Sequence, residues 1–272
     1  MTLILSPGPG RCVPVLLALG VLSQTPAPPA YHPAQLDCAA YRQTLTSEIR
    51  LEGARERSRE TSGRDGVLRL RATAHDSIIS LEAWFDTLDV WREGNGERLV
   101  PATDGVIGGR FTGLLTRQGG LTVTDRPFIP DDVAQVAELS GALEDLLPPL
   151  PQVGLAPGKG WKDGFGTVIT RLPDGLQQGR RVERYRLIRH LSREESRLLP
   201  DSTVVRATRV EEETGIIFWS VEVGLVRWDR TITAAVTVPS GGVVLSPFRT
   251  SIVQQVTVER VAAGACESPG PR

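Results

Sequence analysis

The sequence predicts a mainly β protein, built as a large antiparallel sheet with one helix packed on one face. Two observations lead to this prediction. Apolar and polar residues alternate with a period of two through most of the chain, as expected for half-buried strands. One stretch near the middle, residues 131–147, lacks this alternation and has the spacing of a helix.

The strands begin with a predicted hairpin. Gly66–His75 alternates apolar and polar residues, and Ser77–Phe85 continues the pattern after a short turn around His75–Asp76. The alternation recurs in later segments: Val182–Leu191, Thr203–Val210, Ile216–Trp228, Arg230–Val238 and Thr250–Val261. Short connections rich in Gly, Pro, Asn and Asp join several of them, which favours antiparallel neighbours.

The predicted helix spans Asp131–Leu147. Its apolar and small residues recur at helical spacing: Val133, Val136, Ala137, Ser140, Leu143 and Leu147. Asp131 or Asp132 can cap its N-terminus, and Pro148 and Pro149 end it because proline cannot continue the hydrogen bonding. Its apolar side must be buried, most simply against a face of the sheet.

The first 30 residues have the layout of a secretory signal peptide with a Pro-rich exit. Arg11 precedes the apolar run Val13–Leu22, and the small and Pro-rich residues Ser23–Ala30 follow it. A run of ten is too short to span a bilayer, and no later run is long enough, so no transmembrane span is expected. Residues 31–272 then form one domain, exported to the periplasm or the extracellular space.

The cysteines add to this picture. Cys12 precedes the apolar run, whereas a lipid-attachment cysteine would follow it, so we expect a soluble product. Cys38 and Cys266 remain near the two ends of the exported chain. An even pair in an oxidising compartment predicts a disulfide between them, and the alternative is two unpaired thiols.

Composition and motifs argue against some classes of function but do not identify one. The formal net charge of −1 gives no reason to expect a nucleic acid partner. Arginine far outnumbers lysine, which indicates genome composition or, alternatively, an arginine-lined anion site. No pair among His32, His75 and His190 has metal-ligand spacing, so no metal site is expected. No catalytic motif and no cofactor motif is present either.

The order of these segments along the chain resembles that of known proteins. A leader, a long antiparallel sheet, a mid-chain helix and a Pro-rich stretch are followed by Gly158–Trp161, which leads into further strands. Over Ser47–Val261 this layout resembles uncharacterised bacterial envelope proteins and, more distantly, the periplasmic lipoprotein-carrier half-barrels. The resemblance implies a strongly curved sheet, a half-barrel or open barrel, closed on its concave side by the helix around a cavity for acyl chains. No residue motif accompanies it, so it transfers no functional residue.

The leading hypothesis is non-enzymatic binding or carriage of an apolar, lipid-like small molecule, or an interaction module that binds an envelope protein. The expected cavity lining joins helix residues to aromatic residues of the sheet: Val136, Leu139, Leu143 and Leu147 with Trp84, Phe218 and Trp228. The competing interpretation of these aromatics is ordinary packing. Two alternative functions stay open, an envelope hydrolase that uses Asp163, His190 or Asp229, and a structural β domain of a larger assembly.

Overall fold

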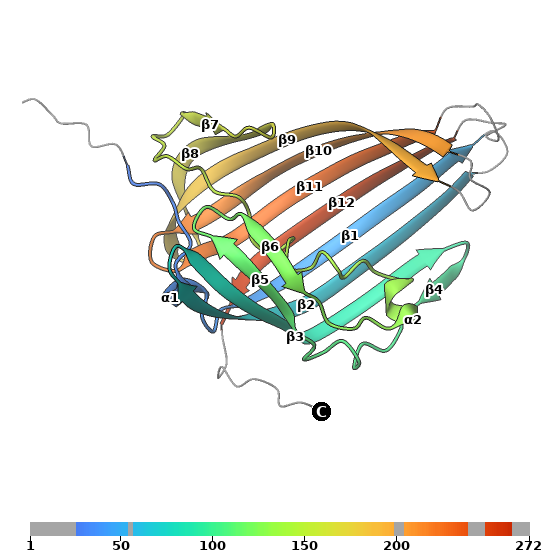
Figure 1. Cartoon of the computed structure of the whole chain (residues 1–272), viewed down its shortest axis with the longest axis horizontal. Helices are drawn as coiled ribbons and strands as arrows, with labels where there is room; N and C mark the ends of the chain where they lie inside the picture. The colour runs from blue at the N-terminus through green and yellow to red at the C-terminus, as the bar shows by residue number, and fades with distance from the viewer. Residues whose placement is uncertain (1–25, 54–56, 199–203, 239–247, 263–272) are drawn as a thin grey trace, which may run out of the picture.

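The strands of the protein form one 12-stranded antiparallel sheet, which confirms the predicted fold class. The computed structural model describes residues 26–53, 57–198, 204–238 and 248–262 (Figure 1). The strands lie in the order β6-β5-β3-β2-β1-β12-β11-β10-β9-β8-β7, with β4 paired to β3. Every pairing is antiparallel, as the short connections predicted.

The elements have the following bounds. The strands are β1 (Ala40–Gly53), β2 (Arg57–His75), β3 (Ile78–Gly94), β4 (Glu97–Leu99), β5 (Phe111–Thr116), β6 (Leu121–Asp125), β7 (Gly160–Lys162), β8 (Thr167–Gln177), β9 (Arg180–Leu198), β10 (Val204–Ser220), β11 (Gly224–Val238) and β12 (Phe248–Val261). The helices are single turns, α1 (Pro33–Leu36) and α2 (Asp131–Ala134).

The sheet curls into a trough. Figure 1 shows β1 and β12 along its floor, β2 and β3 rising on one side, and β8 to β10 rising on the other. Several strands are much longer than usual; β2 and β9 have 19 residues each. Register shifts at Val67/Leu68, Phe218/Trp219 and Leu172/Gly175 mark bulges, and bulges bend and twist long strands.

One long connection crosses the trough. β6 and β7 lie at opposite edges of the sheet, so residues 126–159, here called the inner segment, must run from one edge to the other. The inner segment lies within the concave side in Figure 1, and we call the side of the sheet that it contacts the inner face. Side chains alternate along each strand, so the residues between the inner-face positions point to the outer face.

The inner segment covers only one part of the inner face, which we call the covered half. In this covered half the core contains buried side chains of both the inner segment and the strands. Leu143 and Leu146 come from the inner segment, and Leu68, Leu187 and Trp219 come from β2, β9 and β10. Beyond it, the same strands continue toward Gly53, Arg57 and Val238 without the inner segment above them (Figure 1). We call this second part the open half.

The predicted extent of the helix was wrong. Of the predicted range only α2 is helical. Turns and irregular backbone follow it to Leu147, although Val136, Leu139, Leu143 and Leu147 are all buried as predicted. Backbone carbonyls that a helix would use accept hydrogen bonds from side chains of other segments instead: Gln135 from Arg92, Glu138 from Arg64, Ser140 from Arg126 and Ala142 from Gln43. Gly141 further weakens a helix, by about 1 kcal/mol relative to alanine.

A second expectation also needs correction. Ile216–Trp228 was predicted as one strand, but β10 ends at Ser220 and β11 begins at Gly224. Gly224 has a φ of +78°, a left-handed conformation that suits glycine, and Val221 in the turn is 75% exposed. The predicted turn around His75–Asp76 is confirmed, since Asp76 follows the end of β2 and has a φ of +53°.

The structure describes only part of the two ends of the chain. Residues 1–25, with most of the predicted signal peptide, and Cys266 lie outside the described residues, so the leader and the disulfide to Cys38 stay predictions. From Pro26 onward the chain packs against the covered half. The Tyr31 hydroxyl, fully buried, donates to the carbonyl of Pro148 at 2.9 Å. In the part of the chain that is described, no helix is long and apolar enough to cross a membrane.

Candidate functional site: a cavity and an ion-pair network beneath the inner segment

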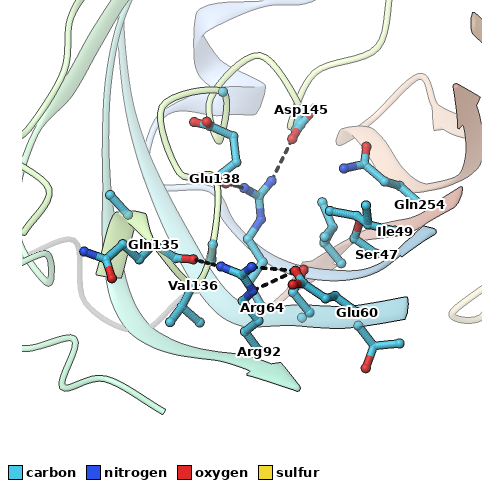
Figure 2. A pocket seen from close by; sticks show the side chains of 17 residues that line it. Ser47, Ile49, Glu60, Arg64, Arg92, Gln135, Val136, Glu138, Asp145 and Gln254 are labelled. Carbon is cyan, nitrogen blue, oxygen red and sulfur yellow. Dashed lines mark hydrogen bonds and ion pairs between the residues drawn. The ribbon is translucent and has the colours of Figure 1, made fainter. Parts of the chain in front are cut away.

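A cavity of about 440 Å³ lies at the border between the covered and open halves, where the inner segment meets β1, β2 and β3. Leu45, Ile49 and Val136 give it aliphatic walls. Ser47, Ser62 and Gln254 add small polar groups, and Figure 2 shows Glu60, Arg64 and Arg92 around the same space. The cavity therefore offers a mixed surface, aliphatic toward β1 and charged toward β2 and β3.

Arg64 anchors the inner segment over this cavity. It lies on β2, is only 3% exposed, and donates from Nη1 to the carbonyl of Glu138 at 2.5 Å. Its Nη2 contacts Oδ2 of Asp145 at 2.7 Å (Figure 2). Burial lowers the pKa of the Arg64 guanidinium, and the nearby carboxylate of Asp145 opposes that shift. A buried arginine of this kind needs its acidic partner.

Arg92 makes a parallel anchor nearer the rim. Its Nε and Nη2 donate to Oε2 of Glu60 at 3.0 and 2.5 Å, and its Nη1 donates to the carbonyl of Gln135 at 2.8 Å (Figure 2). Both cations at this cavity are thus already paired with acids, and both also bind backbone carbonyls of the inner segment. Their main effect is to position that segment.

Asp145 links the two walls of the trough. Besides Arg64 on β2 it binds Arg230 on β11, and Arg230 Nη1 contacts Glu213 Oε1 on β10 at 3.1 Å. Glu213 Oε2 in turn contacts Nη2 of Arg189 on β9 at 2.6 Å. This ion-pair network, Arg64, Asp145, Arg230, Glu213 and Arg189, crosses the inner face. Removing one member would leave buried charges unpaired, which is strongly destabilising.

A second cavity, of about 310 Å³, lies on the other side of Asp145. Leu147 and Trp228 line it together with Leu187 and Thr167. Trp228 is 2% exposed, and the guanidinium of Arg230 stacks over its ring at 4.3 Å. The ion-pair network therefore separates two cavities, one on the β1–β3 side and one on the β8–β11 side.

The open half has an aliphatic floor that continues from the first cavity. Ile49, which lines the cavity, stands directly opposite Ile252 on β12, and Ile252 stands opposite Ala234 on β11. Residues directly opposite in antiparallel pairs share a face. By the same alternation, Leu51 and Ile232 lie on this inner face, and Ile49, Leu51, Ile232 and Ile252 are half-buried. These side chains keep part of their apolar surface in contact with solvent.

The predicted lining residues divide into three groups. Val136, 6% exposed, lines the first cavity, and Leu147 and Trp228 line the second. Leu139 and Leu143 are buried in the core and line neither of these two cavities. The role of the first group in ligand binding stays a prediction.

The remaining two predicted residues, Trp84 and Phe218, lie on the outer face, which corrects their expected position. Trp84 stands between the core residues Ala83 and Phe85 along β3, so it points away from them; its Nε1 donates to Asp86 at 3.0 Å, and Arg110 covers its ring. Phe218 pairs with Arg184 and Arg227, one position out of phase with Trp228. The bulge after Phe218 and the turn at Val221 shift the phase of the alternation between these two residues.

The residues considered for hydrolysis have separate structural partners. Asp163 accepts backbone N–H groups of Phe165 and Thr167, both at 2.8 Å. Asp229 pairs with Arg227 at 2.7 Å and accepts from the Thr257 hydroxyl at 3.0 Å, and His190 is exposed on β9. Within the described chain, no hydrogen bond joins any two of the three candidates, and no group of three or more His, Cys, Asp or Glu side chains is placed to hold a metal ion.

The ion-pair network could not be recognised from alternation alone. Glu213 lies within β10 and is 3% exposed between Arg189 and Arg230, although it stands in a run of three glutamates that is typical of an exposed segment. A usable signal existed, since Glu213 and Arg230 fall on the otherwise apolar side of alternating strands. Their partners come from segments far away in sequence, which the periodicity of one strand cannot pair.

Comparisons with known proteins give no family. No family model and no curated protein matches the sequence. Among solved structures, the chain is similar to one titled "Lipid-protein interactions in lipovitellin", with a TM-score of 0.45 and 10% identity over 86% of this chain and 26% of that one. The chain thus spans about a quarter of the length of that lipovitellin chain.

Two smaller structures also show similarity. Neisserial surface protein A has a TM-score of 0.24 and 8% identity over 82% of this chain and 97% of that one. A DUF1329 family protein from Desulfovibrio piger has a TM-score of 0.18 and 5% identity over 84% of this chain and 88% of that one. These TM-scores all lie below 0.5, so the similarities assign neither a family nor a function.

Proposed function

We propose that the protein binds an apolar, lipid-like small molecule without chemical change and holds its aliphatic chain along the floor of the open half. The observation that carries this proposal is the row of half-buried aliphatic side chains, Ile49, Leu51, Ile232 and Ile252, which continues from the cavity over β1, β12 and β11. A ligand chain lying there would remove both its own surface and theirs from water.

The size and chemistry of the site support this proposal. A volume of about 440 Å³ falls within the range of about 300–1,000 Å³ that small-molecule sites occupy. Each methylene group buried contributes about 0.8 kcal/mol. Ser47, Ser62 and Gln254 stand at the inner end of the floor, where they can bond a polar head group. With the predicted leader, the natural source of such a ligand would be a lipid of the bacterial envelope.

The proposal is tested by binding a dansyl-labelled fatty acid and comparing two adjacent positions of β12. Ile252 lies on the inner face, whereas Val253, 41% exposed, lies on the outer face and is the matched control. Ile252→Asp should weaken binding about tenfold or more, because an ionised carboxylate would lose water against the ligand chain. Val253→Asp should leave the affinity unchanged.

Two results would contradict the proposal. One is a wild-type protein that does not bind the labelled fatty acid; the other is an equal loss of affinity in both variants. Lipid extraction and mass spectrometry of protein purified from its native host adds an independent readout. We expect a lipid that co-purifies with the wild-type protein and is depleted from Ile252→Asp.

A further inference from the structure

The edge of the sheet formed by β7, β8 and β9 carries positive charge that no acid neutralises. Among the described residues, Lys162, Arg184 and Arg186 have no carboxylate within ion-pair distance. Most other arginines of the sheet are paired, as Arg64 and Arg230 illustrate. In a chain with a net charge of −1, this edge is therefore a local concentration of free cations.

The strand register places these cations among apolar side chains on the outer face. Lys162 pairs with Val168, and Val168 pairs with Ile188, so these three form one row across β7, β8 and β9. Arg186 and Ile216 are direct partners in the adjacent row. Ile188 is 42% exposed, and Lys162 and Arg186 are exposed.

An exposed aromatic side chain adjoins these rows. Phe165, 83% exposed, lies in the turn between β7 and β8, three residues after Lys162. The turn is well defined, because Asp163 accepts the backbone N–H groups of Phe165 and Thr167. Two acids next to the rows are engaged elsewhere, Asp163 in this turn and Asp229 with Arg227. We call Lys162, Phe165, Val168, Arg186, Ile188 and Ile216 the edge patch.

We propose that the edge patch docks the protein on an anionic lipid bilayer, with Phe165 inserted at the level of the head groups. Free cations beside exposed apolar side chains match such a surface in both charge and polarity, since basic residues attract anionic lipids and apolar ones enter the interface. An acidic protein or a nucleic acid would match the cations but would leave Phe165 and Ile188 without an apolar partner. The patch lies on the outer face, so this inference is independent of the ligand site.

Sedimentation of the full chain with lipid vesicles tests the proposal. The vesicles contain phosphatidylcholine either alone or mixed with phosphatidylglycerol. We expect binding to the mixed vesicles, little binding to pure phosphatidylcholine, and weaker binding as salt is raised. Reversal of two exposed cations in the double variant Lys162→Glu/Arg186→Glu should lower the partition coefficient at least about tenfold.

The contribution of the aromatic side chain has a matched control. Phe165→Ser should lower the partition coefficient several-fold, whereas Phe128→Ser, which removes another exposed phenylalanine (79%) outside the edge patch, should not. Equal binding to both kinds of vesicle, or no loss in the double variant, would overturn the proposal. So would equally tight, equally charge-dependent binding to a DNA duplex or to poly-glutamate, because that would identify a general polyanion surface. The salt series on the wild-type protein supports or contradicts the proposal even if a variant fails to fold.

Discussion

The two halves of the inner face are built from the same strands but differ in what covers them. In the covered half, Ile169 and Ile217 are fully buried in the core that also contains Leu143 and Leu146 of the inner segment. In the open half, Ile49, Ile232 and Ile252 occupy equivalent inward positions and keep contact with solvent. An apolar face that the described residues leave partly exposed is suited to a ligand, and the following predictions test this contrast from the largest expected effect to the smallest.

Core truncation should have the largest effect, and only in the covered half. Leu143→Ala removes a fully buried side chain and should lower the free energy of unfolding by about 2–5 kcal/mol. Ile252→Ala removes a half-buried one and should cost less than about 1.5 kcal/mol. Urea unfolding of the two variants measures both values. Equal losses would mean that the open half is packed as tightly as the covered half.

The ion-pair network at the border of the halves should be nearly as sensitive. Asp145→Ala leaves Arg64 and Arg230 buried without their shared carboxylate, and should cost about 3 kcal/mol. This figure is at the low end of the range because Asp145 is itself 28% exposed. The matched control is Asp65→Ala, which breaks the exposed pair with Arg42 and should cost at most about 1 kcal/mol. Similar losses in urea unfolding would refute a structural role for the network.

Close packing at the far end of the covered half can be tested with glycines. A Cβ at Gly154 would lie 1.5 Å from the carbonyl oxygen of Pro26, so Gly154→Ala must displace the N-terminal segment. We expect a loss of about 1–3 kcal/mol in thermal or urea unfolding, together with faster proteolysis before Tyr31. Gly164→Ala, where the added Cβ meets nothing within 4 Å, should stay within about 0.5 kcal/mol of wild type. A harmless Gly154→Ala would show that the N-terminal segment is not packed there.

The smallest effect concerns the turn that carries Phe165. Burial opposes ionisation of Asp163, but the hydrogen bonds from Thr167 and Phe165 outweigh it, so the pKa of Asp163 is lowered. A carboxyl whose pKa is lower in the folded state stabilises the fold above its unfolded pKa of about 3.9 and loses that effect as the pH falls. Wild type should therefore exceed Asp163→Asn in stability near neutral pH, and the gap should shrink below about pH 4. A gap independent of pH would exclude this charge effect.

Much of the sheet could be predicted from alternation, because burial on one face imposes a period of two on the sequence. The hairpin of β2 and β3 follows directly from Gly66–His75 and Ser77–Phe85. Alternation gives no information on which distant strands pair, so the contact between β1 and β12, which joins the first strand to the last, was not predictable. A turn can also continue the alternation of apolar and polar residues. At Val221 the alternation therefore hides the end of β10 and the start of β11.

The inner segment shows a second limit of prediction from the sequence. Spacing correctly predicted that Val136, Leu139, Leu143 and Leu147 are buried, but burial does not require a helix. The helix is prevented by donors such as Arg64 and Arg126, which come from other elements and bind its backbone carbonyls. Such donors cannot be assigned before the tertiary structure is known. The candidate site follows the same logic, since it depends on Asp145 meeting Arg230 across 85 residues of sequence.

The central claim, that a ligand chain lies in the open half, is tested most directly by NMR with selectively labelled isoleucine methyl groups and spin-labelled stearic acid. We expect the strongest paramagnetic broadening for Ile49, Ile232 and Ile252. Ile169 and Ile217 in the covered half, and Ile188 and Ile216 on the outer face, should keep narrow signals. Broadening that is strongest on the outer face, or equal at every isoleucine, would contradict the claim.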